Sequence, residues 1–588
     1  MRRTLLLRSA LGLAALGLWA DPAQAALTLS TDAAADLEVK VLAMGLSQPT
    51  DVAELPDGRV VITQRLGDVV VVDKNGDQIE SGTIMVYPEF GEQGLLGVVA
   101  DPDFATNHYL YFYASAGTTS DDPKNKHKVF RIVLGDDGML GERTTIIDKG
   151  LRASRSSVDG GASNHNGGGL QIYKGKLFLS VGDTGHNKTP PNNELGTCLN
   201  ATNGKILRVN LDGSVPDDNP LSNETMVTGC DDWNTATKDE APEKKIFAWG
   251  FRNPYRFWID PMTSRMWIGD VGETTKEEVS VGSPIDGTGA GAKGEHFGWP
   301  FAEGTTKYTQ SFPAASCMDV KPARDCVPPV YDYGHGMNNN CVIGGLIPDG
   351  CGWKAPWNAR YLFGDNGSGR IWYLDVNADR SGVTSTTTKD FASSQGVGSF
   401  RMGANGTLYI AEVSGGVVDK ITPKGLDPAM CGGSSGGTGG MGAGGAAAGS
   451  TSSGGVAGGS SGGISNGGNA GSAPTGGRTG TSGGGGVPAS GGSGTGGAPT
   501  GGSSAAKGGT GPAMGGTSTA GTTASGGSTA TAGNGAANAA GSGGSSGDDK
   551  SGCGCRVGGD APSSTSLMAL SGLLGLMAFR RRRSRAAR

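Results

Sequence analysis

The sequence predicts an all-β fold, a six-bladed β-propeller with long inserted loops. One strand motif occurs six times, turn signals such as Pro56-Asp57-Gly58 and Asn405-Gly406 precede several copies, and no long amphipathic helical pattern separates them. In each copy a short apolar or aromatic strand runs into a Gly/Asp turn. The copies are VVITQRLG from Val60, YLYFYASAG from Tyr109, LFLSVGD from Leu177, MWIGDVG from Met266, YLFGDNGSG from Tyr361 and LYIAEVSGG from Leu408. Radial repetition of such hairpins leaves only short, protected sheet edges.

The copies are unevenly spaced, so the propeller prediction requires long insertions between strands. Two of these insertions, residues 217–245 and 304–340, are expected to determine what the protein recognises. A β-sandwich with accessory loops is the alternative architecture.

The first 25 residues have the order of an export signal. Early arginines precede an apolar segment from Ala10 to Ala20 and the small-residue pattern Ala23-Gln24-Ala25. Cleavage is therefore expected after Ala25. A buried N-terminal helix is the alternative interpretation of the apolar segment.

The composition divides the remainder of the chain into three parts. Residues 431–550 are almost wholly Gly, Ser, Ala and Thr. Such a tract buries too little apolar surface to offset its ordering entropy, which predicts a disordered linker. Residues 26–430 are then the propeller domain, and residues 551–588 form a separate C-terminal segment.

The C-terminal segment contains Cys553 and Cys555, an apolar run from Leu567 to Phe579 and a cluster of arginines. The run is shorter than the about 20 residues of a membrane-spanning helix, but its extension back to Ala561 gives a marginal transmembrane span. This order of parts resembles the myxobacterial C-terminal sorting signal, which implies a place at the cell surface (outer membrane) or secretion after processing. A simple tail anchor is the alternative.

Charge and cysteine content limit the class of protein. The formal net charge is −6 although both ends of the chain are basic, so the central part lacks the excess of positive charge that nucleic-acid binding requires. Six cysteines lie in the predicted propeller without the CxxC spacing of zinc sites, which favours disulfides in an exported protein. Neighbouring pairs are the simplest connectivity, with Cys431 left unassigned. These pairs are Cys198 with Cys230, Cys317 with Cys326 and Cys341 with Cys351.

Seven stretches between about residues 45 and 425 carry a more specific pattern. They are GEQGLLGVVADPDF (91–104), HNGGGLQIYKGKLFLSVGDTG (165–185), GKILRVNLDG (204–213), WGFRNPYRFWIDP (249–261), MWIGDVGETTKEEV (266–279), FGWPFAEG (297–304) and FGDNGSGRIWYL (363–374). In this order they resemble the glucose/sorbosone dehydrogenase family. The resemblance implies a six-bladed propeller and, in active members, oxidation of the C1 hydroxyl of aldoses with pyrroloquinoline quinone (PQQ) and calcium.

The stretch NHNGGG, residues 164–169, contains the candidate base. His165 matches the base of the family, and an imidazole, whose ordinary pKa is near 6.5, can accept a hydroxyl proton at neutral pH. Asp183 matches the family carboxylate that orients and stabilises the imidazolium. The glycines after His165 are expected to let backbone and cofactor approach closely. The alternative for His165 is a hydrogen-bonded turn histidine.

Arg252 and Asn253, in GFRNP, match the family's contacts to the quinone. A guanidinium beside the quinone oxygens would stabilise the negative charge that develops there. An arginine that ties two blades together is the alternative role of Arg252.

Gly272, in GDVGE, matches the loop whose backbone carbonyls hold the cofactor-bound calcium in the family. Asp270, Glu277 and Glu278 are nearby hard oxygen donors of the kind that calcium takes, which makes them candidate metal ligands. The alternative is a set of solvated acidic residues on a turn.

The sequence also departs from the soluble glucose dehydrogenase branch of the family. Tyr255, Val271 and Glu92 stand where that branch has glutamines, and Glu92 is then a candidate cofactor contact of altered chemistry. GVGS (396–399) replaces two arginines that pair with the cofactor carboxylates, and Arg401 is displaced. The cations that could substitute are Arg256, Arg370 and Lys420.

Two hypotheses of function follow. The first is an exported PQQ- and calcium-dependent dehydrogenase that oxidises the C1 hydroxyl of aldose sugars and passes electrons to an unidentified acceptor. The second is a noncatalytic cell-surface propeller that binds carbohydrate or protein partners, because the form RNPYRF is also similar to relatives of hedgehog-interacting protein. A calcium-dependent lactonase of propeller fold is a further alternative.

Overall fold

A computed structural model describes the part of the chain that corresponds to the predicted propeller. The described residues are 27–86, 91–115, 127–148, 151, 164–184, 194–229, 241–286, 294–307, 316–336, 338–427 and 431. The predicted signal peptide, linker and C-terminal segment lie outside them, so those predictions stay untested.

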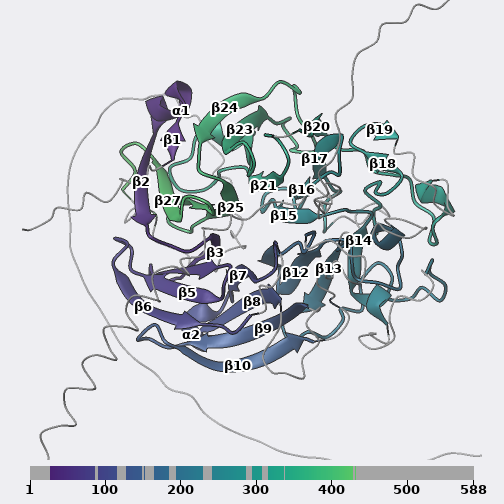
Figure 1. Ribbon diagram of the computed structural model, residues 1–588, viewed down its shortest axis with the longest axis horizontal. Coiled ribbons are helices and arrows are strands. Elements are labelled where there is room, and N and C mark those ends of the chain that lie inside the picture. Colours follow the sequence, from purple (N-terminus) through teal and green to yellow (C-terminus); the bar gives the residue numbers. More distant parts are fainter. Residues whose placement is uncertain are drawn as a thin grey trace, which may run out of the picture. The chain divides into compact units, whose positions relative to one another are not determined.

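Six antiparallel sheets are arranged around a central axis as the blades of a propeller (Figure 1). Their innermost strands contact one another in ring order, and the last contacts the first. These innermost strands, for blades 1 to 6, are β3 (Pro49–Glu54), β7 (Leu95–Ala100), β11 (Leu170–Tyr173), β15 (Pro254–Ile259), β21 (Val342–Leu346) and β25 (Val397–Met402). The predicted six-bladed propeller is confirmed, and the β-sandwich alternative is wrong.

The second strand of every blade is one copy of the repeated sequence motif. These strands are β4 (Val60–Gln64), β8 (Tyr109–Ser115), β12 (Lys176–Val181), β16 (Met266–Asp270), β22 (Arg360–Asp365) and β26 (Leu408–Glu412). They are buried almost throughout, because blades cover both of their faces. Continuous apolar runs rather than strict alternation are expected for strands covered on two sides.

The third and fourth strands complete the blades toward the rim. The third strands are β5 (Asp68–Val72), β9 (His127–Leu134), β13 (Lys205–Asn210), β17 (Lys276–Val281), β23 (Arg370–Asp375) and β27 (Val417–Pro423). The fourth strands are β6 (Gln78–Thr83), β10 (Leu140–Ile147), β14 (Ile246–Trp249), β20 (Tyr331–Gly334), β24 (Lys389–Ser393) and β2 (Leu37–Ala43). The outer strands β6 and β10 carry mainly exposed or half-buried residues, as expected for the edge of a blade.

The N-terminal strand β2 closes the ring. It pairs antiparallel with β27, with Leu37 opposite Pro423 and Lys40 opposite Lys420. In Figure 1 the purple β2 lies beside the green β27. A second N-terminal strand, β1 (Thr28–Leu29), adds a fifth strand to blade 5 next to β24. The two ends of the propeller sequence are therefore tied by main-chain hydrogen bonds.

The hydrophobic core lies between neighbouring blades. One cluster joins Val61 and Val71 of blade 1 to Phe112 of blade 2, and another joins Tyr111 of blade 2 to Leu179 of blade 3. A larger cluster continues through blades 4, 5 and 6. Each blade is thus stabilised by burial of apolar surface against both of its neighbours.

Helices are short in the described residues. The helices are α1 (Thr31–Asp36), capped by the Ser30 side chain, and α2 (Phe104–Asn107). Single 3₁₀ turns occur at Glu194–Gly196, Pro242–Lys245, Cys317–Asp319 and Trp357–Ala359, and a small hairpin is formed by β18 (Ala302–Glu303) and β19 (Thr306–Lys307). None of the helices in these ranges has the length and apolar character needed to cross a membrane.

Disulfides agree only in part with the predicted pairing. Cys317 and Cys326 are bonded, as predicted, but Cys351 is bonded to Cys431 rather than to Cys341. The second bond spans 80 residues and ties the end of the propeller to blade 5, which proximity in sequence could not indicate. The predicted partner of Cys198, Cys230, lies outside the described residues.

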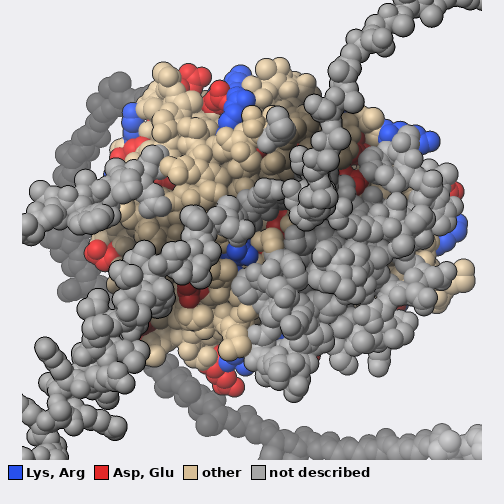
Figure 2. Space-filling model, in the orientation of Figure 1, with Lys and Arg blue, Asp and Glu red and all other residues tan. Residues whose placement is uncertain are grey.

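On the face shown in Figure 2, acidic and basic side chains are interspersed over the described surface. They form no broad basic area on that part of this face.

Candidate functional site

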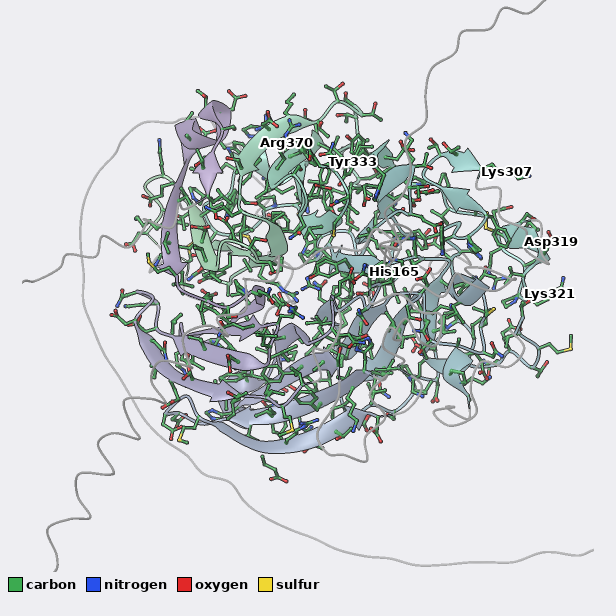
Figure 3. All side chains as sticks on the ribbon, in the orientation of Figure 1. His165, Lys307, Asp319, Lys321, Tyr333 and Arg370 are labelled. Carbon is green, nitrogen blue, oxygen red and sulfur yellow. A yellow bond between two sulfur atoms is a disulfide. The ribbon has the colours of Figure 1, made fainter. Side chains whose placement is uncertain are left out.

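The candidate residues lie where several blades present the same end of their inner strands. Glu92 precedes β7, His165 precedes β11 and Arg252 precedes β15, whereas Asp183 and Gly272 follow the second strands β12 and β16. First and second strands of a blade are antiparallel, so the start of one and the end of the other lie on the same side. His165 is accordingly near the middle of the ring in Figure 3, and Lys307 and Asp319 are near its rim.

His165 and Asp183 form a buried pair. His165 Nδ1 lies 2.6 Å from Asp183 Oδ1, and the two residues are 2% and 1% exposed. An ionised carboxylate can only accept, so a neutral imidazole beside it carries its proton on Nδ1 and its lone pair on Nε2. Nε2 is buried and has no hydrogen-bond partner among the described residues. This is the state that a general base requires.

The backbone of His165 is held in an uncommon conformation. Its φ is 65°, in the left-handed region that residues other than glycine seldom adopt. Glu92 Oε2 accepts the backbone N–H of His165 at 2.8 Å and that of Asn166 at 3.2 Å. Burial raises the pKa of Glu92, although the nearby His165 and these N–H donors act in the opposite direction. Glu92 is therefore a support of the His165 loop in this structure.

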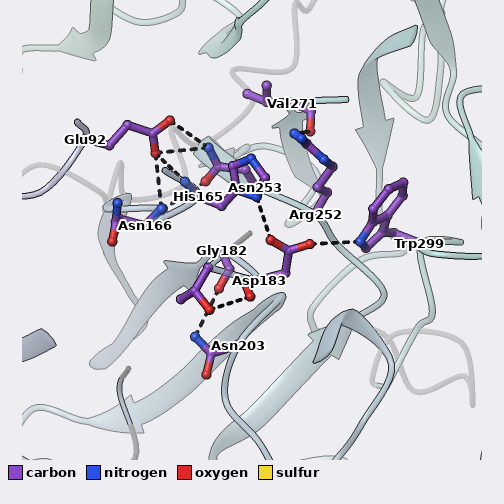
Figure 4. A network of polar contacts seen from close by, with 12 residues as sticks. Glu92, His165, Asn166, Gly182, Asp183, Asn203, Arg252, Asn253, Val271 and Trp299 are labelled. Carbon is purple, nitrogen blue, oxygen red and sulfur yellow. Dashed lines mark hydrogen bonds and ion pairs between the residues drawn. The ribbon is translucent and has the colours of Figure 1, made fainter. Parts of the chain in front are cut away.

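Asn253 links the His165 loop to the start of β15. Its Oδ1 accepts the Gly167 N–H at 3.1 Å, and its Nδ2 lies 3.3 Å from Glu92 Oε2. The Asn253 side chain is fully buried, and Figure 4 shows it between Glu92 and Arg252. In this structure Asn253 connects protein groups.

The second oxygen of Asp183 is also engaged. Asp183 Oδ2 accepts the indole N–H of Trp299 at 3.0 Å, and its backbone N–H donates to the Arg252 carbonyl at 2.7 Å. Asp183 therefore joins blade 3 to the GFRNP segment and to the loop that carries Trp299 (Figure 4). His165 and Arg252, distant in sequence, belong to one contiguous network.

Arg252 is buried beside this network. Its Nη1 donates to the Val271 carbonyl at 3.1 Å and to the Gly272 carbonyl at 2.6 Å. Its Cζ lies 5.7 Å from the centre of the Trp299 ring, within the range of a cation–π interaction. The guanidinium thus joins the start of blade 4 to the turn that follows β16 in the same blade.

The glycines after His165 serve the packing of the blades. A Cβ on Gly168, whose φ is 119°, would lie 2.7 Å from Leu96 Cβ. A Cβ on Gly169 would lie 2.9 Å from the Phe257 ring. The expectation that these glycines leave space for a cofactor is therefore corrected for Gly168 and Gly169, because protein atoms already fill the space beside them.

Asp270 and Glu278 face each other across β16 and β17. The Asp270 oxygens accept the backbone N–H groups of Arg252 at 3.1 Å and Asn253 at 2.7 Å, and Glu278 accepts the N–H of Gly304. Burial raises the pKa of Asp270 to about 7, and burial together with the Asp270 charge raises the pKa of Glu278 well above its ordinary value. These carboxyls bind protein donors in a dry environment.

Glu277 faces a different part of the molecule. One oxygen bonds to the His335 ring, and the other accepts the Val342 N–H at 3.0 Å, so this side chain connects blades 4 and 5. The turn after Gly272 is fixed by Glu303, whose Oε1 accepts four successive backbone N–H groups from residues 273–276. Within the described residues, no group of three His, Cys, Asp or Glu side chains is placed to hold a metal ion.

The cations considered as substitutes for the missing arginines all have protein partners. Arg256 donates to the carbonyls of Thr50 and Leu96 at 2.9 Å each, and thereby joins blades 1, 2 and 4. Arg401 forms two hydrogen bonds with the buried Asp51 carboxylate, which holds the Asp51 pKa below its ordinary value. The other two cations bind exposed residues: Arg370 forms an ion pair with Asp390, and Lys420 donates to the Lys74 carbonyl.

Trp299 is a residue of this network that sequence reasoning did not select as a candidate. It lies in FGWPFAEG, which was noted only as part of a family pattern. The sequence did contain a signal, a tryptophan in a Gly-rich stretch between two predicted strands. A buried indole N–H usually has a hydrogen-bond partner, so this tryptophan could have been expected to bind a nearby acceptor.

Comparisons with known proteins agree with the fold. Residues 46–418 match the family described as Glucose / Sorbosone dehydrogenase. Aldose sugar dehydrogenase YliI of Escherichia coli is 25% identical over 400 residues, which are 67% of this chain and 94% of that protein. Quinoprotein glucose dehydrogenase B of Acinetobacter calcoaceticus is 25% identical over 292 residues, 46% of this chain and 53% of that protein.

A solved structure gives the same architecture. The apo form of the soluble aldose sugar dehydrogenase from Escherichia coli aligns with a TM-score of 0.50 at 22% identity, over 66% of this chain and 100% of that chain. At this identity the likeness supports the fold alone.

Proposed function

Since the chain belongs to the glucose/sorbosone dehydrogenase family, we propose that it oxidises the C1 hydroxyl of aldose sugars with PQQ and calcium. One observation carries the proposal: His165 Nε2 is buried without a hydrogen-bond partner in the described chain, while Nδ1 is bound to Asp183. The printed names of two relatives, aldose sugar dehydrogenase and quinoprotein glucose dehydrogenase B, support the substrate class and the kind of cofactor.

His165 is the proposed general base. With Nδ1–H directed at Asp183, the Nε2 lone pair accepts the proton of the C1 hydroxyl. The Asp183 carboxylate stabilises the imidazolium that forms. It also holds the ring in one orientation and one tautomer. When bound, PQQ supplies the acceptor for the hydride that leaves C1, so that the sugar is oxidised to a lactone.

Arg252 is the proposed electrostatic partner of the quinone. Its guanidinium is 3% exposed and belongs to the same network as His165, so it places a positive charge in a region of low dielectric. Negative charge that develops on a quinone oxygen is stabilised by such a group, and loss of a comparable donor commonly costs about 3 kcal/mol. From the start of β15, the Asn253 side chain supports the loop of His165 by accepting the Gly167 N–H.

The described residues fit the reacting end of a quinone better than its carboxylate end. Arg256 and Arg401 bind protein groups instead of presenting a free fork to cofactor carboxylates. This observation favours the second candidate function, a noncatalytic propeller that binds carbohydrate or a protein partner. The two candidates differ in whether PQQ binds saturably.

Calcium is proposed to bind the Gly272 carbonyl. This oxygen accepts from Arg252, but a carbonyl has a second lone pair, and calcium takes oxygen ligands. Asp270, Glu277 and Glu278 already accept hydrogen bonds from backbone N–H groups.

Export is proposed from the N-terminal signal and the disulfides. Cys317–Cys326 and Cys351–Cys431 are the kind of bond that persists in oxidising compartments. The C-terminal segment supports a final place at the cell surface, or secretion after processing. The electron acceptor would then be encountered outside the cytoplasm.

The test compares the whole protein with two histidine variants. In the presence of PQQ and Ca²⁺, the native protein is expected to reduce an artificial dye when aldoses are added. His165→Ala is expected to lower the rate about 10²–10⁴-fold, the usual contribution of a general base. His108→Ala is the matched control, because His108 also has a positive φ, 58°, but is half-buried at the C-terminal end of α2, away from the candidate site.

Two results would argue against the proposal. Absence of saturable PQQ binding together with absence of dye reduction would favour the noncatalytic propeller. Equal dye reduction by His165→Ala and His108→Ala would remove His165 from the mechanism.

A further inference from the structure

We infer that Trp299 is a positioning residue that fixes the Asp183 carboxylate and the Arg252 guanidinium relative to each other. The inference deepens the proposed dehydrogenase function and rests on it. Trp299 is 3% exposed and contacts both groups, one through its N–H and the other through its ring face. It acts on the reaction through these two side chains.

The indole N–H determines how Asp183 is oriented. Asp183 Oδ2 accepts from Trp299 Nε1 at 3.0 Å, which leaves Oδ1 for His165 Nδ1 at 2.6 Å. Two donors on opposite oxygens prevent rotation of the carboxylate about its Cβ–Cγ bond. The hydrogen bond to His165 thereby keeps its direction, and the lone pair on Nε2 keeps its place.

The ring face of the same indole lies beside the Arg252 guanidinium. The distance of 5.7 Å from Cζ to the ring centre permits a cation–π attraction in this buried environment. Figure 4 shows Asp183 between His165 and Trp299, with Arg252 beside the indole. One side chain thus contacts both Asp183, which binds the proposed base, and Arg252, the proposed electrostatic partner of the quinone.

The position of Trp299 is fixed by hydrogen bonds between its own backbone segment and a neighbouring one. Residues 294–299 run alongside 247–250, with hydrogen bonds from Gly294 N to Phe247 O at 3.0 Å and from Trp299 N to Gly250 O at 2.9 Å. A Cβ on Gly196 would lie 2.7 Å from Trp299 Cδ1. The backbone of Trp299 is therefore fixed, and Gly196 lies against the indole.

The chain contains a closely matched tryptophan elsewhere. Trp357 is 4% exposed, its Nε1 donates to Asp36 Oδ2 at 2.9 Å, and the Arg360 Cζ lies 4.5 Å from its ring centre. It has the same two kinds of contact, at the junction of the N-terminal helix α1 with blade 5. Trp357→Phe thus controls for the structural cost of losing an indole N–H.

The experiment uses Trp299→Phe, which keeps an aromatic ring and removes the N–H, beside Trp357→Phe. Histidine-selective ¹⁵N–¹H NMR of the protein without PQQ reports the His165 Nδ1 proton, and the chain has only 6 histidines to assign. Trp299→Phe is expected to weaken or shift this signal, and Trp357→Phe to leave it unchanged. With PQQ, Ca²⁺ and aldose, Trp299→Phe is expected to lower kcat about tenfold or more, with KM changed less than about twofold.

The outcomes separate this inference from the proposed function. If the native protein reduces no dye, the dehydrogenase proposal fails, and the NMR comparison still decides whether Trp299 positions Asp183. If both phenylalanine variants leave the Nδ1 signal and kcat unchanged, the inference is overturned. Trp299→His, which retains a ring N–H, is compared with the native protein if Trp299→Phe does not fold, and loss of the Nδ1 signal in this variant would then overturn the inference.

Discussion

Replacement of Asp183 by asparagine would impair His165 as the proposed base while the volume of the side chain at position 183 stays nearly the same. The carboxylate accepts from two donors, Trp299 Nε1 and His165 Nδ1. An asparagine has one acceptor oxygen and one NH₂ group, so it can serve only one of them. The indole nitrogen is always a donor, whereas an imidazole can change its tautomer. We expect the amide oxygen to stay on Trp299 and the NH₂ group to face His165.

The magnitude follows from this exchange. The imidazole would then accept at Nδ1 and carry its proton on Nε2, where the hydroxyl proton of the sugar has to go. Loss of a hydrogen bond to a charged group is worth about 1.5–3 kcal/mol, which corresponds to about 10- to 150-fold in rate. The wrong tautomer adds to this loss, so kcat is expected to fall about 10²–10⁴-fold.

The assay is aldose-dependent dye reduction with PQQ and Ca²⁺, combined with ¹⁵N–¹H NMR to locate the imidazole proton. Asp101→Asn is the matched control, because Asp101 is also buried and accepts from two donors, the Tyr111 hydroxyl and the Asp103 N–H. If Asp183→Asn kept at least about a fifth of the native kcat with the proton still on Nδ1, the reasoning would be refuted.

Two further predictions concern stability. Arg401→Met leaves the fully buried Asp51 carboxylate without its guanidinium and is expected to lower the free energy of unfolding in urea by about 3–5 kcal/mol; an unchanged midpoint would contradict this. Burial beside Asp419 raises the pKa of Glu412 to about 8, so between about pH 4.5 and 8 the folded protein holds a proton that the unfolded chain has lost. This contribution to stability is therefore present at low pH and lost as pH rises through about 8. Tm measured against pH should fall less steeply in Glu412→Gln than in the native protein, and identical slopes would contradict the assignment.

The repeated strand motif was sufficient to predict the blades. Each copy, from Val60 to Leu408, became the second strand of one blade, because that strand is covered on both faces and so has the most regular apolar pattern. The pairing of β2 with β27 was not predicted. Closure of a ring joins residues far apart in sequence, and no local pattern records it.

The candidate site was predicted in part. The sequence selected His165, Asp183 and Arg252, and the structure joins them in one network. Composition could not show that Trp299 lies within this network, since its place depends on the register of residues 294–299 against 247–250.

The acidic candidates show a second limit of sequence reasoning. Asp270 and Glu278 were selected as oxygen donors near the calcium loop, but the start of β15 and the turn at Gly304 supply N–H donors that occupy them. Whether a carboxylate is available to a metal depends on its tertiary neighbours. The pairing of Cys351 with Cys431 has the same origin, because it follows from where the chain leaves the propeller.

The most direct test of the central claim is a single turnover of the PQQ-loaded protein with aldose, followed by the absorbance of the bound quinone. The native protein is expected to reduce its PQQ rapidly, and His165→Ala is expected to bind PQQ with similar affinity but to reduce it about 10²–10⁴-fold more slowly. Equal rates of quinone reduction in the two proteins would contradict the assignment of Nε2 of His165 as the base.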